Sequence, residues 1–350
     1  MTTSRHDRTL SPNPSPVKGE GSGVSRSASF TLMLLLALLA LVGCGEPPAP
    51  PLRVGTNPWV GYDPLVLARE RRLLDPGQVQ VVELVSNTET QRTLRNGLLD
   101  GAAMTLDEAL RLADEGVALK IVAVLDISHG ADAVLAGPGI TTPAQLKGRR
   151  IAVEQTALGA LVLDRLLQAG GLRPDEVSLI QAEAGLHEGM LASGRVDAVI
   201  TFEPMKSRIV ALGNRVIFDS RQMPGEIVDV LAVRADAWST RRPQVLELLA
   251  GWERGRRALL ADPSAAAALL APGADLPPAQ YLATLEGLKF QTLADSARWL
   301  GGQPAPLAQH AAMLARTLQH LGLIRHPPDW SVLLDGRSAA AAQSHLVNSP

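Results

Sequence analysis

The strongest constraint on the fold is an alternation of short apolar strands with amphipathic helices. In the first round of this alternation, we predict strands near residues 54–55, 79–85, 102–104 and 120–127, and helices at about 63–74, 87–98 and 106–115. Strands that alternate with helices in this way form parallel-rich, doubly wound sheets with helices on their faces. The sequence therefore predicts an α/β protein.

The same alternation then occurs a second time in the same register. Residues 150–154 (RIAVE) resemble residues 53–57 (RVGTN), and the same shift carries residues 96–100 (NGLLD) onto residues 193–197 (SGRVD). Agreement at several elements predicts two similarly built lobes. Because the matched residues are few, chance agreement is the alternative.

After Arg234 the pattern is almost wholly helical, and these helices are expected to pack back onto the first lobe. The expected organisation is lobe 1 from residues 53–134 plus 232–335, lobe 2 from residues 135–231, and a disordered tail at residues 336–350. The two places where the chain passes between lobes, near residues 131–137 and 226–234, would then act as a hinge.

The N-terminal region is expected to direct export. Residues 30–42 (FTLMLLLALLALV) are too few to cross a bilayer, which takes about 20 residues. They lead into Leu-Val-Gly-Cys, which ends at Cys44, the only cysteine of the chain. A short apolar run followed by small residues is typical of a secretory signal, and this ending resembles a bacterial lipobox. We expect residues 1–44 to be the signal region, Cys44 to be acylated, and the proline-rich residues 45–52 to be a spacer. An ordinary signal peptide with an incidental cysteine is the alternative.

Composition and motifs argue against several classes of function. The net charge is −2, whereas a nucleic-acid-binding protein would need a basic face. There is no Gly-x-Ser-x-Gly motif and no phosphate-binding loop, and His187-Glu188 lacks the second histidine of a zinc protease motif. We therefore expect no catalytic residue, no cofactor and no metal site.

The loop after the first strand is the most distinctive stretch of the chain. Residues 53–65 (RVGTNPWVGYDPL) carry Trp59 and Tyr62, although only 3% of all residues are aromatic. In open α/β sheets, ligands bind beyond the carboxyl ends of the strands, next to helix N-termini. The loop is therefore a candidate for ligand contact, and a purely structural core role for Trp59 is the alternative.

Other loops at strand ends are expected to converge on the same cleft between the lobes. The candidate ligand-binding residues are Asn57, Trp59, Tyr62, Ser86, Asn87, Thr105, Asp107, Asp126, Asp132, Glu154, Thr156, Ala157, Gly159, Phe202, Glu203, Glu226 and Asp229.

Two features of these candidates point to different ligands. Residues 156–159 open a helix, whose free amides could hold an anion, although a plain helix start is equally compatible with the pattern. In contrast, four carboxylates lie at strand ends, and no Lys or Arg lies among them. They are Asp126, Glu154, Glu203 and Asp229. Because a buried carboxylate needs a partner, we favour a small nitrogen-bearing organic solute that stacks on Trp59 over nitrate or a simple sulfonate.

Several stretches also resemble one known family. They are RVGTNPWVGYDPLVLARE (53–70), SNTETQRTLRNGLLDGAAMTLDEAL (86–110), GRVDAVITFEP (194–204) and FDSRQMPGEIVDVLAVR (218–234). They resemble the nitrate/sulfonate/taurine group of ABC-importer substrate-binding proteins, which is close to the thiamine-precursor binding proteins. The resemblance implies a type II periplasmic binding-protein fold, in which two α/β lobes joined by two crossover strands close on a ligand.

The resemblance also implies a function. It is that of an exported, lipid-anchored monomer on the periplasmic face of a bacterial membrane, which delivers a small nitrogen- or sulfur-bearing solute to an ABC permease. One alternative is an enzyme of the pyrimidine-synthase kind, although the chain lacks the cysteine-rich motif of those enzymes. Another is a ligand-sensing receptor that docks on a membrane sensor.

Overall fold

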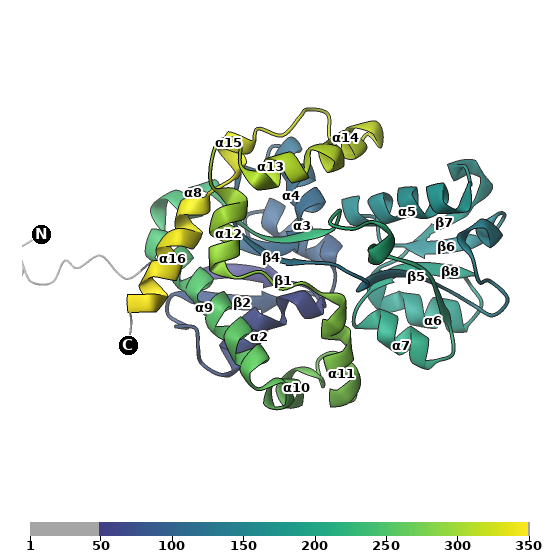
Figure 1. Ribbon diagram of the computed structural model, residues 1–350, viewed down its shortest axis with the longest axis horizontal. Coiled ribbons are helices and arrows are strands. Elements are labelled where there is room, and N and C mark those ends of the chain that lie inside the picture. Colours follow the sequence, from purple (N-terminus) through teal and green to yellow (C-terminus); the bar gives the residue numbers. More distant parts are fainter. Residues whose placement is uncertain (1–48, 349–350) are drawn as a thin grey trace, which may run out of the picture. The chain divides into compact units, whose positions relative to one another are not determined.

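The computed structural model describes residues 49–348 (Figure 1). The expected signal region and Cys44 lie outside these residues. The described chain contains two five-stranded sheets, each covered by helices. We call the first sheet and its helices lobe 1, and the second sheet and its helices lobe 2.

The two sheets have the same strand order. In lobe 1 the order is β2 (Val79–Glu83), β1 (Leu52–Thr56), β3 (Gly101–Thr105), β10 (Val228–Arg234) and β4 (Leu119–Ile127). In lobe 2 it is β7 (Ser178–Gln181), β6 (Arg150–Val153), β8 (Ala198–Phe202), β5 (Asp132–Ala136) and β9 (Arg215–Asp219). The first three strands of each sheet are parallel, whereas β10 and β5 pair antiparallel with both of their neighbours. The predicted α/β class is confirmed, with sheets that are mixed.

The repeat seen in the sequence corresponds to equivalent hydrogen bonds. The Asp100 carboxylate accepts from the Arg53 amide at 2.7 Å, and the Asp197 carboxylate accepts from the Arg150 amide at 2.8 Å. In both lobes, this aspartate precedes the third strand and holds the start of the first strand beside it. The repeated Asp therefore sets the same register in both sheets.

Helices cover both faces of each sheet. Lobe 2 has α5 (Ala157–Gly170) on one face and α6 (His187–Ala192) and α7 (Met205–Ala211) on the other (Figure 1). Lobe 1 has α2 (Asp63–Glu70), α3 (Asn87–Arg95), α4 (Leu106–Asp114), α8 (Ala235–Thr240), α9 (Arg242–Ala261), α10 (Pro263–Leu270), α11 (Pro278–Thr284), α12 (Leu293–Leu300), α13 (Pro306–His310), α14 (Ala312–His320), α15 (Trp330–Leu333) and α16 (Gly336–Asn348). Among the described residues, no helix is both long and apolar enough to cross a membrane.

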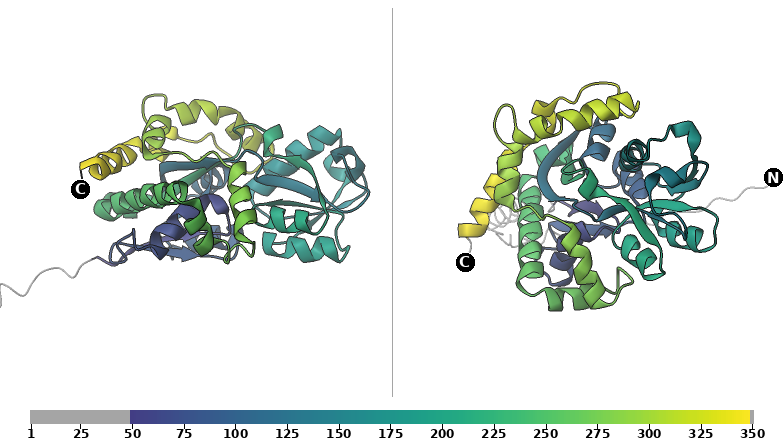
Figure 2. Two further views of the ribbon diagram at one scale, coloured as in Figure 1. Left: turned by 60° about the horizontal axis from the view of Figure 1, so that its bottom comes forward. Right: turned by 45° about the vertical axis from the view of Figure 1, so that its right-hand side comes forward.

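The C-terminal helices pack on lobe 1, and they include the segment that was expected to be a disordered tail. α9 packs on α2, and α16 packs on both α9 and α12 (Figure 2). Ala339 and Ala342 of α16 are fully buried. The prediction of disorder was wrong for the described part of this segment, because its alanines form a small apolar face that allows close helix packing.

The chain passes between the sheets at residues 128–131 and 220–227, slightly earlier than predicted. All of β5 lies in lobe 2 and all of β10 lies in lobe 1. The two crossing segments are joined, because the hydroxyls of Ser128 and Ser220 lie 2.8 Å apart and the Ser220 hydroxyl accepts from the Gly130 amide at 2.6 Å. These segments are the candidate hinge.

Candidate ligand-binding site

A small cavity lies where the strand ends of the two lobes meet. Its volume is about 10 Å³, and the residues around it are Asn57, Trp59, Tyr62, Asn87, Thr105 and Asp229 from lobe 1 and Asp132, Leu158 and Phe202 from lobe 2. A cavity of this size has room for about one water molecule. All of these residues except Leu158 were predicted from the sequence. Leu158 was missed because an apolar side chain near the start of a helix carries no chemical signal.

The aromatic loop forms one wall of the cavity. After β1, the chain turns through a short 3-10 helix (Val60–Tyr62) into α2, which has Pro64 in its first turn. A Cβ atom on Gly61 would lie 2.2 Å from the Trp59 indole nitrogen and 2.3 Å from an Asp126 carboxylate oxygen. Glycine at this position therefore allows the indole and the carboxylate to approach each other.

Trp59 also contacts the opposite lobe. Its ring lies edge-on to Phe202 of lobe 2, with centroids 5.8 Å apart, and 6.4 Å from the ring of Tyr62. Trp59 is only 5% exposed. It is therefore a buried residue, as the structural alternative expected, and it also lines the cavity between the lobes.

Carboxylates of lobe 1 gather at the ends of β4 and β10. Asp126 and Asp229 are partners across these two strands, and Asp229 also pairs with Thr105 of β3. The Tyr62 hydroxyl donates to Asp229 Oδ1 at 2.5 Å. Burial raises the pKa of Asp229 well above its usual range, and the neighbouring Asp126 raises this pKa further. Burial also raises the pKa of Asp107, Asp126 and Asp132 to about 7.

Many polar atoms around the cavity are buried and have no hydrogen-bond partner. They are both carboxylate oxygens of Asp107 and Asp126, Oδ2 of Asp132 and Asp229, Asn57 Oδ1, Thr105 Oγ1 and Trp59 Nε1. Some of these groups face one another, because Asp126 lies against Asp229 and the Trp59 indole, and Asp107 lies against Thr105. Buried polar groups are normally paired, so each of these atoms needs an explanation. Most of them are acceptors, and the residues that line the cavity include no Lys or Arg. The arrangement suits a ligand that supplies N–H donors.

Hydrogen bonds on either side of the cavity join the lobes. The backbone amide and hydroxyl of Thr88, at the start of α3, both donate to Glu154 Oε1 at the end of β6, at 2.8 and 2.7 Å. Elsewhere, Arg165 of α5 donates to the Thr317 hydroxyl of α14 at 3.1 Å. Glu154 thus lies at the lobe interface, as the sequence predicted, but its partner there is Thr88.

Two other predicted residues, Ser86 and Glu203, are engaged in hydrogen bonds within the fold. Ser86 accepts from the Glu89 amide and caps α3. Glu203 accepts from the Ser207 amide and hydroxyl at 3.0 Å and pairs with Lys206 at 3.1 Å. Ser86 is therefore the N-cap of α3, whereas Glu203 is bonded to the first turn of α7, and neither residue lines the cavity.

The helix start that could have held an anion is also occupied. Thr156 Oγ1 accepts from the Gly159 amide at 3.0 Å, so the hydroxyl caps α5 in the ordinary way. Ala157 and Gly159 are buried at this helix start without lining the cavity. Glu226 lies farther along the return crossing, where it accepts from the Arg165 guanidinium at 2.9 Å.

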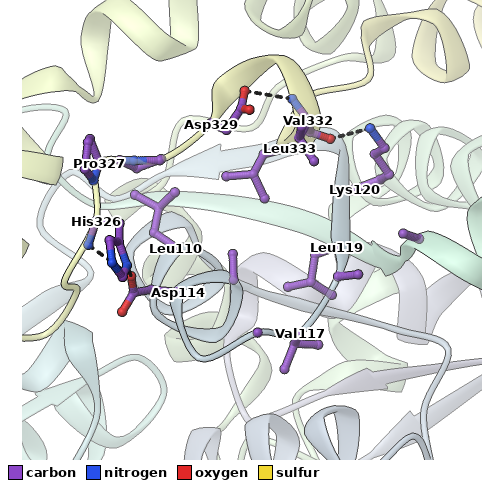
Figure 3. A pocket seen from close by; sticks show the side chains of 15 residues that line it. Leu110, Asp114, Val117, Leu119, Lys120, His326, Pro327, Asp329, Val332 and Leu333 are labelled. Carbon is purple, nitrogen blue, oxygen red and sulfur yellow. Dashed lines mark hydrogen bonds and ion pairs between the residues drawn. The ribbon is translucent and has the colours of Figure 1, made fainter.

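A larger hollow, of about 330 Å³, lies on lobe 1 beside α4 and the segment before α15 (Figure 3). Its wall is mostly apolar, and its polar groups pair with each other. Asp114 accepts from the His326 ring at 3.0 Å, Asp329 accepts from the Val332 amide at 3.3 Å, and Lys120 donates to the Val332 carbonyl. Nothing in this hollow has the unpaired polar atoms of the cavity between the lobes. Among the described residues, no group of three or more His, Cys, Asp or Glu could hold a metal ion.

The fold defines the class of protein. The periplasmic nitrate-binding protein NrtA from Synechocystis PCC 6803 has a similar fold; it is 14% identical, with a TM-score of 0.71 over 86% of this chain and 90% of that one. The periplasmic aliphatic sulphonate-binding protein SsuA from Escherichia coli is 19% identical, with a TM-score of 0.67 over 82% of this chain and 92% of that one. The ligand-binding component of an ABC-type import system from Staphylococcus aureus, solved with zinc bound, is 13% identical, with a TM-score of 0.70 over 84% of this chain and 99% of that one.

The sequence itself assigns the family. Residues 45–271 match the model of the NMT1-like family, and the chain belongs to this family. No curated protein sequence matches the chain. The desulfurization enzyme DSZB also shares the fold, at 17% identity and a TM-score of 0.62 over 85% of this chain and 100% of that one. The fold is therefore common to binding proteins and at least one enzyme.

Proposed function

We propose that this protein is an extracytoplasmic solute-binding protein that captures a small nitrogen- or sulfur-bearing organic solute between its lobes and delivers it to an ABC importer. The observation that carries the proposal is that aromatic rings and unpaired polar atoms from both lobes line one cavity. The family and the shared fold support a binding role of this kind.

The cavity of about 10 Å³ is too small to hold an organic solute in this arrangement, so the lobes must be farther apart than they are here both when the solute enters and when it is bound. The crossing segments at 128–131 and 220–227 are where such a motion would occur, since hinges are a few residues between rigid elements. A solute that contacts both lobes favours the closed form, because only that form provides all of its contacts. The closed form is then the one presented to the permease.

The anchor is part of the proposal. Acylation of Cys44 would tether the mature chain to the periplasmic face of a bacterial membrane without a spanning helix. Wild-type protein should incorporate labelled palmitate and fractionate with membranes, whereas Cys44→Ser should do neither. Membrane association of the variant equal to that of the wild type would contradict the anchor.

Two other functions are the alternatives. An enzyme of the pyrimidine-synthase kind would convert its ligand, and no cysteine nucleophile is available in the lobes, because Cys44 is the only cysteine. A receptor would dock on a membrane sensor instead of a permease, which affinity capture from membranes would distinguish.

The proposal is tested by screening the mature chain, as Cys44→Ser, against nitrogen- and sulfur-bearing metabolites by thermal shift. We expect a solute that raises the melting temperature and is recovered chemically unchanged, as judged by mass spectrometry. A solute that is recovered as a different compound would instead establish an enzyme.

A further inference from the structure

We infer that the cavity selects an organic cation that carries N–H donors, with its positive charge held between Asp132 of lobe 2 and Asp229 of lobe 1. This inference rests on the proposed function and specifies the ligand class. The cation would be a protonated amine, an amidinium or a guanidinium.

The position of the two aspartates carries the inference. Asp132 begins β5 and is 3% exposed, and Asp229 lies near the start of β10 and is 1% exposed. Both line the same cavity, and Oδ2 of Asp132 has no hydrogen-bond partner. Asp229 can bond to Asp126 only when one of these two carboxyl groups is protonated. Because Asp132 and Asp229 belong to different lobes, closure brings two acidic groups together in a dry space. Such a pair must be neutralised by protons or by a cation.

The residues that line the cavity include no Lys or Arg to supply that positive charge. Against the effect of burial, Lys206 lowers the pKa of Asp132, but its ammonium group is already engaged, because it pairs with Glu203 at 3.1 Å and donates to the Gly130 carbonyl at 2.9 Å. Tyr62 donates only to Oδ1 of Asp229. Burial is the main cause of the raised pKa of both aspartates, and Asp132 itself raises the pKa of Asp229. Protons therefore occupy these groups readily, and a cation can replace them.

The rest of the cavity also suits a cation. Trp59, Tyr62 and Phe202 line it, and aromatic faces attract ammonium and guanidinium groups. A donor that an anion could use, the Gly159 amide, is already bonded to Thr156. The site therefore differs in charge from one built for an anion.

The test is a thermal-shift and calorimetric panel on the mature chain as Cys44→Ser. Primary amines, amidines and guanidines are each matched with an alcohol or amide of the same size, and with a carboxylate or sulfonate. We expect stabilisation by cations alone. Stabilisation by neutral or anionic members alone would overturn this inference and leave the proposed function intact. No response from any class would contradict the proposed function as well.

Two refinements test the assigned atoms. Fully N-methylated cations should bind more weakly than their parents, because they cannot donate to Asp132 and Asp229; equal binding would overturn the hydrogen-bonded arrangement.

Asp132→Asn and Asp229→Asn should each weaken binding of the best cation by about 10- to 100-fold, the range for losing a hydrogen bond to a charged group. The matched control, Asp175→Asn, removes an exposed carboxylate that pairs with Arg173, and it should bind as the wild type does. Wild-type affinity in both cavity variants would overturn the inference.

Discussion

At the scale of single residues, a buried tyrosine donates to a buried aspartate at two separate places in the described part of the chain. Tyr62 donates to Asp229 at 2.5 Å beside the cavity, and Tyr281 donates to Asp63 at 2.6 Å within lobe 1. In both pairs burial raises the pKa of the carboxyl group, to about 7 for Asp63 and well above its usual range for Asp229. The pairs therefore allow ligand binding to be separated from stability.

We predict that Tyr62→Phe and Tyr281→Phe each lower the free energy of unfolding by about 1–3 kcal/mol, because each leaves a buried carboxyl group without its donor. Only Tyr62→Phe should also weaken binding of the cation that the panel identifies. Urea denaturation and calorimetry measure the two effects. Equal ligand affinity in the two variants would remove Tyr62 from the site.

Residue positions at strand ends could be anticipated from the sequence, but their partners could not. Asp126, Asp132 and Asp229 lie at or next to the ends of apolar strands, which is the position from which contact with the cleft was predicted. Glu226 has the same kind of position, yet it pairs with Arg165 from a helix of lobe 2. Such a pairing depends on how separate elements pack, which no local pattern contains.

At the scale of elements, the C-terminal helix α16 packs on the helices of lobe 1, and the contact between α3 and the end of β6 joins the two lobes. The start of α16 is fixed by Asp335, which accepts from the Trp238 indole at 2.7 Å and from the Ser338 hydroxyl. This helix was not predicted from the sequence, because an alanine-rich segment resembles a low-complexity segment. Its buried positions become meaningful only when α9 and α12 are in place.

We predict that Ala339→Asp destabilises the protein by about 3–5 kcal/mol, the cost of an unpaired buried charge. Ala339 is fully buried, whereas Ala340, the next residue in the same helix, is exposed. Ala340→Asp is the matched control and should change stability by less than about 0.5 kcal/mol. Similar urea midpoints for the two variants would mean that α16 does not pack as described.

The hydrogen bonds from Thr88 to Glu154 join α3 to the opposite lobe. We predict that Thr88→Val, which keeps the side-chain volume but loses the hydroxyl, lowers affinity for the cation by about 5- to 10-fold, since one hydrogen bond of the closed form is lost. Thr93→Val in the same helix is the control, because its hydroxyl donates to the Glu89 carbonyl within lobe 1. Calorimetry should separate them, and equal affinities would show that the Thr88 hydroxyl contributes nothing to closure.

At the scale of the whole molecule, the buried carboxyl groups govern the response to pH. The pKa values of Asp63, Asp107, Asp126 and Asp132 are raised to about 7 by burial. The folded state therefore holds these protons more tightly than the unfolded chain does. The pKa of His187 is lowered to about 4 by burial, which acts in the opposite direction but involves one group.

We predict that the ligand-free protein loses stability as the pH rises from about 5 to about 7, because the unfolded chain has already released protons that the folded chain retains. Asp132→Asn should make this decline shallower. Affinity for the cation should rise over the same interval, because binding displaces those protons. Urea denaturation and calorimetry at several pH values check both trends, and a rise in ligand-free stability over this interval would contradict the assigned burial.

The proposed function requires that both lobes hold one solute at the same time. Amide hydrogen exchange, measured with and without the most stabilising cation of the panel, tests this directly. The predicted result is slower exchange in residues 57–62 and 86–90 of lobe 1 together with residues 131–133 and 157–159 of lobe 2. Slowing that is confined to one lobe, or to residues 326–333 beside the larger hollow, would contradict it.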